Sequence, residues 1–159
     1  MNNKSSKIQD EKEAREYAFK LLGRRDYTRF GIKTKLEKRN YSEEVISCVM
    51  RYLVGAGLVN DKKFALNYAY FRLKRKPRGP RVLGYELFKK GISQKLIKEV
   101  IPGVYDEISE ESLAEKVVKK EIGHKKITDE IRQKIYQKLL RLGFSYESIE
   151  KVTKLLRTE

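Results

Sequence analysis

The residues of this sequence best suited to binding chemistry are the arginines and lysines around one proline- and glycine-containing turn, Pro77-Arg-Gly-Pro80. Guanidinium and ammonium groups bind phosphate and carboxylate, and free backbone N–H groups in a turn add further donors for anions. Between Arg72 and Lys90 there are eight basic residues and one acid, Glu86. We predict an anion-binding surface here, although an ordinary solvated helix face would have the same composition; its candidate residues are Arg72, Arg75, Lys76, Arg78, Arg81, Lys89 and Lys90.

A smaller basic cluster lies earlier in the chain and includes an aromatic residue. It consists of Arg24, Arg25, Tyr27 and Arg29. Arginine and tyrosine together suit either phosphate-and-base contacts or the hot spot of a protein interface. Between Asp106 and Ile122 the sign of the charge reverses, with six acids against three lysines. A uniformly basic nucleic-acid binder has little reason for such a stretch, so it is either a solvated helix face or a surface for a protein partner.

The overall charge restricts the class of partner. The chain has 159 residues, and 37 Lys and Arg against 22 Asp and Glu give a formal net charge of +15. A charge of this size attracts polyanions or acidic protein surfaces. The sequence has no apolar run of about 20 residues and no hydrophobic signal region, so we expect a cytoplasmic protein with no membrane partner.

The sequence offers no recognisable catalytic or metal-binding constellation. Cys48 and His124 are each the only residue of their type, which leaves no second Cys or His to complete a zinc site. Cys48 is expected to be a buried, inert thiol and His124 a surface residue near a helix end. Paired acids such as Glu43 and Glu44 fall in the first turn of a predicted helix, where carboxylates favour the helix dipole. We therefore predict a protein that is not an enzyme and has no cofactor.

The elements that must position the basic residues are all predicted to be helices. Ala14, Tyr17, Ala18, Leu21 and Leu22 form a stripe with the helical spacing, and similar stripes recur along the chain without convincing β alternation. Breakers divide the chain into about nine helices, of which the first is predicted to begin at Asp10 and the sixth to end at Ile101, before Pro102-Gly103. The expected N-caps are Asp10, Ser42, Asn60 or Asp61, Ser93, Ser109, Thr128 and Ser145.

These helices fall into three groups because the sequence repeats itself. Leu36-Glu-Lys-Arg-Asn-Tyr-Ser42 aligns with Leu87-Phe-Lys-Lys-Gly-Ile-Ser93 and with Leu139-Leu-Arg-Leu-Gly-Phe-Ser145. In each copy we expect a buried Leu, a left-handed Asn or Gly, an apolar residue that packs back, and a Ser cap. The predicted organisation is a frayed tail over 1–9 and three-helix repeats over 10–58, 59–105 and 106–159.

Tandem units that share interfaces predict an elongated, curved helical array with a concave binding face. Helix-turn-helix reading of a DNA groove is less favoured, because the third helix of each repeat has acids such as Glu44, Glu99 and Glu150, which repel phosphate. Two aromatic pairs, Tyr17/Tyr68 and Phe19/Phe71, are interpreted as core or interface filler rather than as base-stacking residues.

Three motifs, in the right order, resemble the RecX family of regulatory proteins. They are Arg24-Arg-Asp-Tyr-Thr-Arg29 followed by Lys35-Leu-Glu-Lys-Arg39, then Gly57-Leu-Val-Asn-Asp-Lys-Lys-Phe-Ala65, and then the run from Arg75 to Ile92 that ends in Glu-Leu-Phe-Lys-Lys-Gly-Ile. The likeness covers residues 13–157. One departure is Gly31-Ile32, where the family usually has an acid followed by Leu, and the third repeat diverges most.

The resemblance implies an all-α protein that binds the RecA–single-stranded-DNA filament and modulates, mainly by inhibition, its recombinase and coprotease activities. On this interpretation the chain is a monomeric regulator of DNA repair and of the SOS response. Its partner is RecA, with or without direct contact to DNA. The alternative is a basic helical module that binds single-stranded or branched DNA without RecA, and a third possibility is another acidic protein partner.

Overall fold

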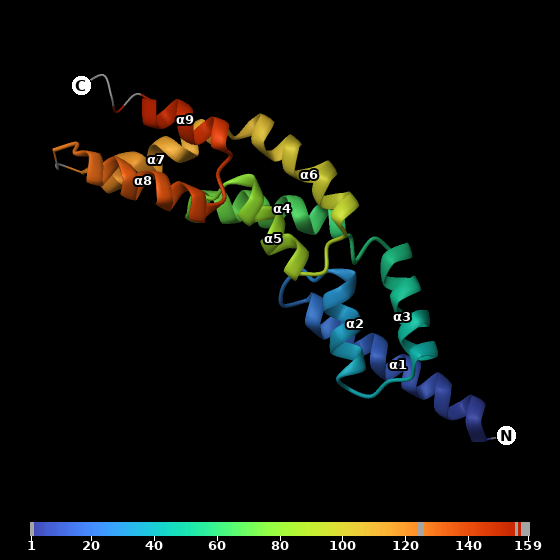
Figure 1. The fold of residues 1–159 in the computed structure, drawn as a ribbon. Coiled ribbons are helices and arrows are strands. Elements are labelled where there is room, and N and C mark those ends of the chain that lie inside the picture. The colour runs from blue at the N-terminus through green and yellow to red at the C-terminus, as the bar shows by residue number, and fades with distance from the viewer. Residues whose placement is uncertain (1, 124–125, 155, 157–159) are drawn as a thin grey trace. The chain divides into compact units, whose positions relative to one another are not determined.

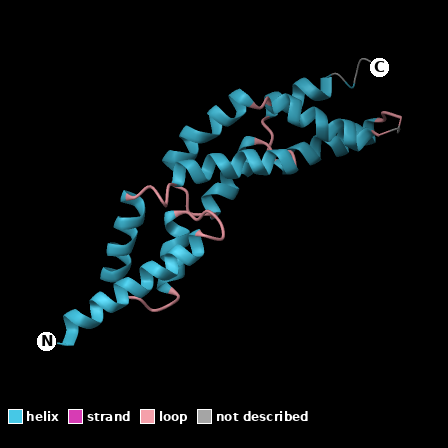
Figure 2. Ribbon diagram, turned by 180° about the vertical axis from the view of Figure 1, so that it is seen from behind, coloured by secondary structure: helices cyan, strands magenta, loops and turns pink. Residues whose placement is uncertain are grey.

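The computed structural model describes residues 2–123, 126–154 and 156, and within these ranges it contains helices and no strand (Figure 2). The predicted all-α fold is therefore confirmed. The described residues form nine α-helices in three consecutive sets of three, labelled in Figure 1: α1 (Asn2–Leu22), α2 (Arg29–Glu37), α3 (Glu43–Gly55), α4 (Asp61–Arg75), α5 (Pro80–Lys89), α6 (Gln94–Glu107), α7 (Glu110–Ile122), α8 (Asp129–Leu142) and α9 (Tyr146–Lys154).

The helices pack as two compact units. The first comprises Met1–Phe64 with Lys90–Ile92, and the second comprises Ala65–Lys89 with Ser93–Glu159. In the first unit, α3 packs against both α1 and α2. In the second unit, α5 packs on α6, while α7, α8 and α9 contact one another. The three-helix repeats and the compact units are thus different divisions of the chain, and the predicted repeat boundaries remain a prediction.

The core of the first unit is the predicted helical stripe. Ala14 and Ala18 of α1 are fully buried, and so are Ile32 of α2 and Leu53 of α3. Burial of an Ile or Leu side chain contributes about 1.5–3 kcal/mol and burial of an Ala methyl group about 0.8 kcal/mol, so these few positions hold the three helices together.

The repeated Leu-to-Ser segment has the predicted structure in all three copies. The three leucines, Leu36, Leu87 and Leu139, are fully buried. The left-handed position after each has a positive φ, 60° at Asn40, 82° at Gly91 and 84° at Gly143. The hydroxyls of Ser42, Ser93 and Ser145 accept hydrogen bonds from backbone N–H groups in the first turn of α3, α6 and α9. The alignment of the three repeats is confirmed by this geometry.

Two helix boundaries differ from the prediction. Helix α1 begins at Asn2 and not at Asp10, so residues 2–9 are helical rather than a frayed tail. These residues include no Gly or Pro, and Lys7 forms an ion pair with Glu44 of α3. Helix α6 continues through Pro102 to Glu107. The residues after the proline pack well enough to keep the helix going, because Val104 is fully buried and the Tyr105 hydroxyl donates to the Arg78 carbonyl at 2.8 Å.

Candidate functional site

The basic turn between α4 and α5 lies directly against the turn between α8 and α9. The Gly79 N–H donates to the Leu142 carbonyl at 2.9 Å, and the Arg81 N–H donates to the Gly143 carbonyl at 3.2 Å. A Cβ atom on Gly79 would lie 2.1 Å from the Gly143 carbonyl carbon, so only glycine permits this approach. The expectation that the turn's backbone N–H groups are free for anions is therefore wrong at Gly79 and Arg81.

Two of the predicted binding arginines are committed to an internal ion pair. Arg72 donates from Nε and Nη2 to the two carboxylate oxygens of Glu86, at 2.9 and 3.0 Å. The Arg78 Nε lies 3.8 Å from the same carboxylate, and the Tyr68 hydroxyl donates to it at 3.0 Å. The side chains of Arg72, Arg78 and Glu86 are only 20–22% exposed. Arg72 and Arg78, both predicted as anion-binding residues, are therefore already paired, and their partner is the single acid of the basic stretch.

The titration of this cluster reflects its burial and its pairing. Burial by itself would raise the pKa of Glu86, but hydrogen bonds from Arg72 and Tyr68 and the nearby arginine charges outweigh it, so the pKa lies below its ordinary value. The pKa of Tyr68 is raised, first by burial and then by its hydrogen bond to the Glu86 carboxylate. Glu86 is therefore ionised at neutral pH and neutralises part of the basic stretch.

The remaining basic side chains of the second unit reach the surface. Arg75 and Lys76 are exposed, and the Arg75 guanidinium lies 5.5 Å from the centre of the Phe71 ring. The Arg81 guanidinium donates to the Leu140 carbonyl at 2.7 Å, which fixes it over the end of α8. The Lys89 ammonium lies 5.8 Å from the centre of the Tyr85 ring. Arg75, Lys76 and Lys89 thus remain available to a partner, as does Lys74, which is also exposed.

The first basic cluster is built around the turn between α1 and α2. Arg24 and Arg25 are exposed, and the Arg25 guanidinium lies 4.6 Å from the centre of the half-buried Tyr27 ring. Arg29 is also exposed, and its backbone N–H donates to the Asp61 carboxylate at 2.8 Å. The structure brings these four residues together, and it places arginines beside an aromatic ring as predicted.

This turn is held at the same place as the turn between α4 and α5, but by a side-chain hydroxyl where the other turn uses a backbone N–H. The buried Thr28 hydroxyl donates to the Lys90 carbonyl at 2.7 Å and accepts from the Gly31 N–H at 3.0 Å, which makes Thr28 the N-cap of α2. Thr28 is offset by 51 residues from Gly79, and Lys90 by 52 from Leu142, so the two contacts occupy equivalent positions. Lys90, predicted as a binding residue, therefore also has a structural role through its backbone.

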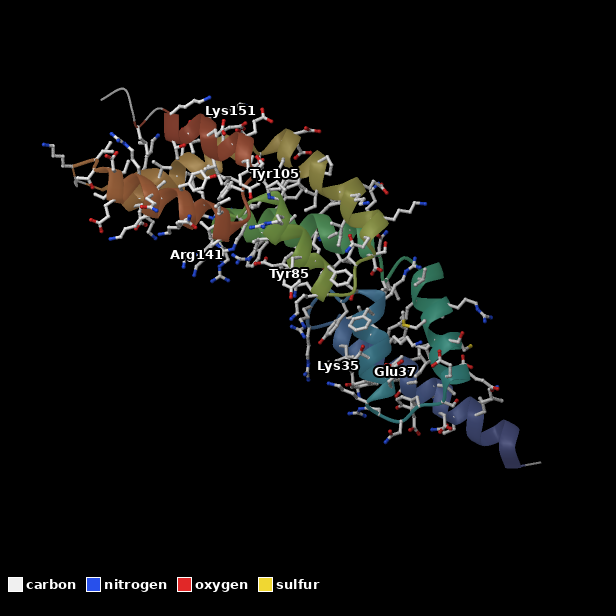
Figure 3. The ribbon with its side chains drawn as sticks, in the orientation of Figure 1. Lys35, Glu37, Tyr85, Tyr105, Arg141 and Lys151 are labelled. Carbon is white, nitrogen blue, oxygen red and sulfur yellow. The ribbon has the colours of Figure 1, made fainter. Side chains whose placement is uncertain are left out.

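The acidic stretch has partners inside the second unit. The Glu107 carboxylate accepts from the Tyr70 hydroxyl at 2.6 Å, and the Glu110 carboxylate accepts from the Ser145 N–H at 2.6 Å. Glu111 and Glu121 form ion pairs with Lys151 and Lys138. Lys151 is labelled at α9 in Figure 3. The first contact ties α4 to α6 and the others tie α7 to α8, to α9 and to the turn before α9, so the reversal of charge has a structural explanation.

The residues expected to be inert agree with the structure only in part. Cys48 is half-buried rather than buried, and its pKa is raised, first by a hydrogen bond with Glu11 and then by burial. The thiolate is therefore disfavoured. His124 lies outside the described residues. Within the part of the chain that the structure describes, no group of three or more His, Cys, Asp or Glu residues is placed to hold a metal ion.

A membrane-spanning segment is not found among the described helices: none is both long and apolar enough to cross a bilayer.

The surface aromatics were missed by the sequence reasoning. Phe71, interpreted as filler, is 59% exposed, and Tyr85 and Phe88 of α5 are 60% and 50% exposed. Tyr85 is labelled in Figure 3, as is Tyr105, which by contrast is half-buried. The sequence does indicate their exposure, because these aromatics lie outside the buried stripes of α4 and α5 and next to basic residues.

Comparison with known proteins gives consistent results in sequence and in structure. Two family models match, "RecX, first three-helix domain" over residues 14–53 and "RecX, second three-helix domain" over residues 60–101. The "Regulatory protein RecX" of Chlorobium phaeobacteroides (strain BS1) is 38% identical over 140 residues, covering 88% of this chain and 91% of that protein. The protein of the same name from Caldanaerobacter subterraneus subsp. tengcongensis is 32% identical over 148 residues, covering 91% and 71%.

A solved structure has the same fold. The crystal structure of RecX from Lactobacillus salivarius superimposes with a TM-score of 0.88 at 25% sequence identity, covering 96% of this chain and 99% of that one. The two domain matches, each to a three-helix domain, agree with the repeats and caps described above. The relative from Chlorobium phaeobacteroides and the superposition agree with them too. The chain belongs to the RecX family of regulatory proteins.

Proposed function

We propose that this protein binds the RecA filament on single-stranded DNA and restrains its recombinase and coprotease activities without itself catalysing a reaction. The observation that carries the proposal is the pair Arg75 and Lys76. Both are exposed, and neither has a carboxylate within ion-pairing distance in the described part of the chain. They project from a turn whose backbone is fixed by the contact with Leu142 and Gly143, so the charges are presented by a rigid support.

The pairing of arginine with an aromatic ring supports the same proposal. Arg75 lies beside Phe71 in one turn and Arg25 beside Tyr27 in the other. Such pairs suit a composite surface of phosphates and protein, because the ring holds the guanidinium in place while its N–H groups stay available. A filament of protein on nucleic acid offers both kinds of contact.

The experiment compares the parent chain with Arg75→Glu/Lys76→Glu in co-sedimentation with RecA filaments and in inhibition of RecA's DNA-dependent ATPase at two salt concentrations. Each reversal changes the charge by 2, so the variant's formal net charge falls from +15 by 4. Lys12→Glu/Lys20→Glu, at two exposed positions of α1, is the control with the same change. We expect the Arg75/Lys76 variant alone to lose binding and to show a flatter salt dependence, since it makes fewer cation–anion contacts.

The second candidate, a DNA-binding module that needs no RecA, is favoured by the net charge of +15. It predicts that the chain binds an oligonucleotide alone at physiological salt, and that this binding accounts for all of its recovery with filaments. Co-sedimentation without RecA therefore separates the two functions. Equal inhibition by a folded Arg75/Lys76 variant and by the control would remove this turn from the interface.

A further inference from the structure

Two apolar grooves occupy equivalent positions in the first two repeats. One lies between α2 and α3 and the other between α5 and α6, with volumes of about 570 and 560 Å³. Five of the seven residues that line the first groove lie 51 positions before residues that line the second. Met50 corresponds in this way to Ile101, and Lys33 to Gly84. Each groove lies within one compact unit. The first two repeats therefore share a groove as well as a core.

The two grooves share their chemistry. Each is lined by aliphatic and aromatic side chains and by cations, and neither is lined by an acid. Arg51 lines the first groove and Lys98 the second; both are exposed and have no ion-pair partner among the described residues. The aromatic lining is exposed: Phe30 in the first groove is 56% exposed and Tyr85 in the second is 60% exposed. Exposed large apolar side chains around a hollow mark a binding surface rather than an unused face.

The concavity beside α8 is of another kind. It is lined by Glu121 and Glu130 together with lysines, glutamines and an arginine. A mixed polar surface of this composition is an ordinary solvated face. The shared apolar and cationic character thus distinguishes the first two grooves.

The lining indicates what the grooves would bind. Met50 and Val54 in the first groove, and Ile97 and Ile101 in the second, form aliphatic surfaces that fit a bulky apolar side chain. A nucleobase could stack on the exposed rings of Phe30, Tyr85 and Phe88, but it would leave these aliphatic surfaces unfilled. The unpaired cations attract carboxylates and steer the approach of an acidic surface. The cations would attract phosphate as well as carboxylate, so it is the aliphatic lining that favours a protein segment over a nucleic acid.

We infer that the two grooves bind two copies of the same acidic protein segment, one that inserts a bulky apolar side chain between carboxylates. This inference rests on the proposed function, because a filament presents identical segments on its successive subunits. Two equivalent grooves on one chain then engage two subunits, and the second contact is made at a high effective concentration. The grooves supply the protein contacts, while Arg75 and Lys76 supply contacts to anions.

The test measures the affinity of the full-length chain for RecA filaments assembled on an oligonucleotide. The groove variants are Arg51→Glu, Lys98→Glu and the charge-neutral Tyr85→Ala. Matched controls are Lys95→Glu, an exposed charge on α6 outside the groove, and Tyr146→Ala, an aromatic of α9 that is 69% exposed. We expect each groove variant to weaken binding about tenfold with an unchanged melting temperature, and Arg51→Glu/Lys98→Glu to lose about the product of the two effects.

The possible results are separable. If the parent binds filaments and each groove variant binds as its control does, the groove inference is overturned and the proposed function stands. If the groove variants lose affinity for the RecA-free oligonucleotide in the same proportion, the grooves are nucleic-acid sites and the inference is also overturned. If the parent does not bind filaments at all, the proposed function itself fails. A loss confined to the groove variants and to the RecA filament supports the inference.

Discussion

Replacing Gly79 by alanine should separate the two turns that meet in the second unit. Gly79 does not have a positive φ, so an alanine can adopt its backbone conformation. The obstacle is the neighbouring backbone, because the new Cβ would lie 2.1 Å from the Gly143 carbonyl carbon and from the Phe144 nitrogen. Neither atom is the end of a flexible side chain, so the turns themselves must move apart.

The size of the effect follows from what that movement breaks. The hydrogen bonds from the Gly79 and Arg81 N–H groups to the Leu142 and Gly143 carbonyls are both lost. Each backbone hydrogen bond contributes about 1 kcal/mol net, and the alanine's restriction of the unfolded chain returns about 0.4–1 kcal/mol. Gly79 and Gly143 are buried, so leaving their groups unpaired adds a desolvation cost, and we expect a net loss of about 1–3 kcal/mol in the free energy of unfolding.

The assay is urea denaturation followed by far-UV circular dichroism, with thermal melting as a second measurement. The control is Gly103→Ala in α6, where a new Cβ meets nothing within 4 Å. Removing a glycine from a helix should stabilise that variant by about 0.5–1 kcal/mol. The two Gly→Ala changes should therefore have opposite signs, and a Gly79→Ala protein as stable as the parent would show that this backbone contact is not made.

Three further substitutions test other contacts of the fold. Leu87→Ala removes a fully buried side chain and should cost about 2–5 kcal/mol in urea denaturation, whereas a cost near zero would contradict the alignment of the repeats. Glu86→Gln should destabilise the chain at neutral pH, because it leaves Arg72 and Arg78 facing an uncharged amide. Folding lowers the pKa of Glu86, so the stabilisation of the fold by this carboxylate is present above its ordinary pKa of 4.5 and is lost as the pH falls. The free energies of unfolding of parent and variant should therefore converge in acid. A difference that stays constant with pH would refute this. Thr28→Val removes both the cap of α2 and the hydrogen bond to the Lys90 carbonyl and should cost about 2 kcal/mol by thermal melting, while Thr28→Ser, which keeps both bonds, should melt close to the parent.

The helices and their repetition were readable from the sequence because their signals are local. A serine that caps a helix, an Asn or Gly with positive φ and a buried Leu all act within one or two turns of chain, as at Leu36, Asn40 and Ser42. The boundary errors arose where distant contacts override a local preference. Helix α6 passes Pro102 because Val104 and Tyr105 pack beyond it, and no local rule reports that.

The basic and aromatic candidates were found from the sequence, but their availability was decided by the tertiary structure. Composition gives the same weight to Arg72, Arg75 and Arg78, yet two of them face Glu86 and one is exposed. Whether an arginine meets a carboxylate depends on how α5 lies on α4, which residue types alone do not specify. The equivalent hollows between the second and third helices were likewise invisible, because a groove is defined by the space between elements.

What the sequence by itself determined is therefore the family, the all-α class and the threefold repeat of helix, turn and cap, since each is encoded within segments short enough to act locally. Only the tertiary structure decided which charges stay free and how the basic turns are supported. Thr28 meets Lys90 across 62 residues of chain, and Gly79 meets Leu142 in the same way. Contacts of that range are products of packing, because no local signal carries the identity of a partner so far along the chain.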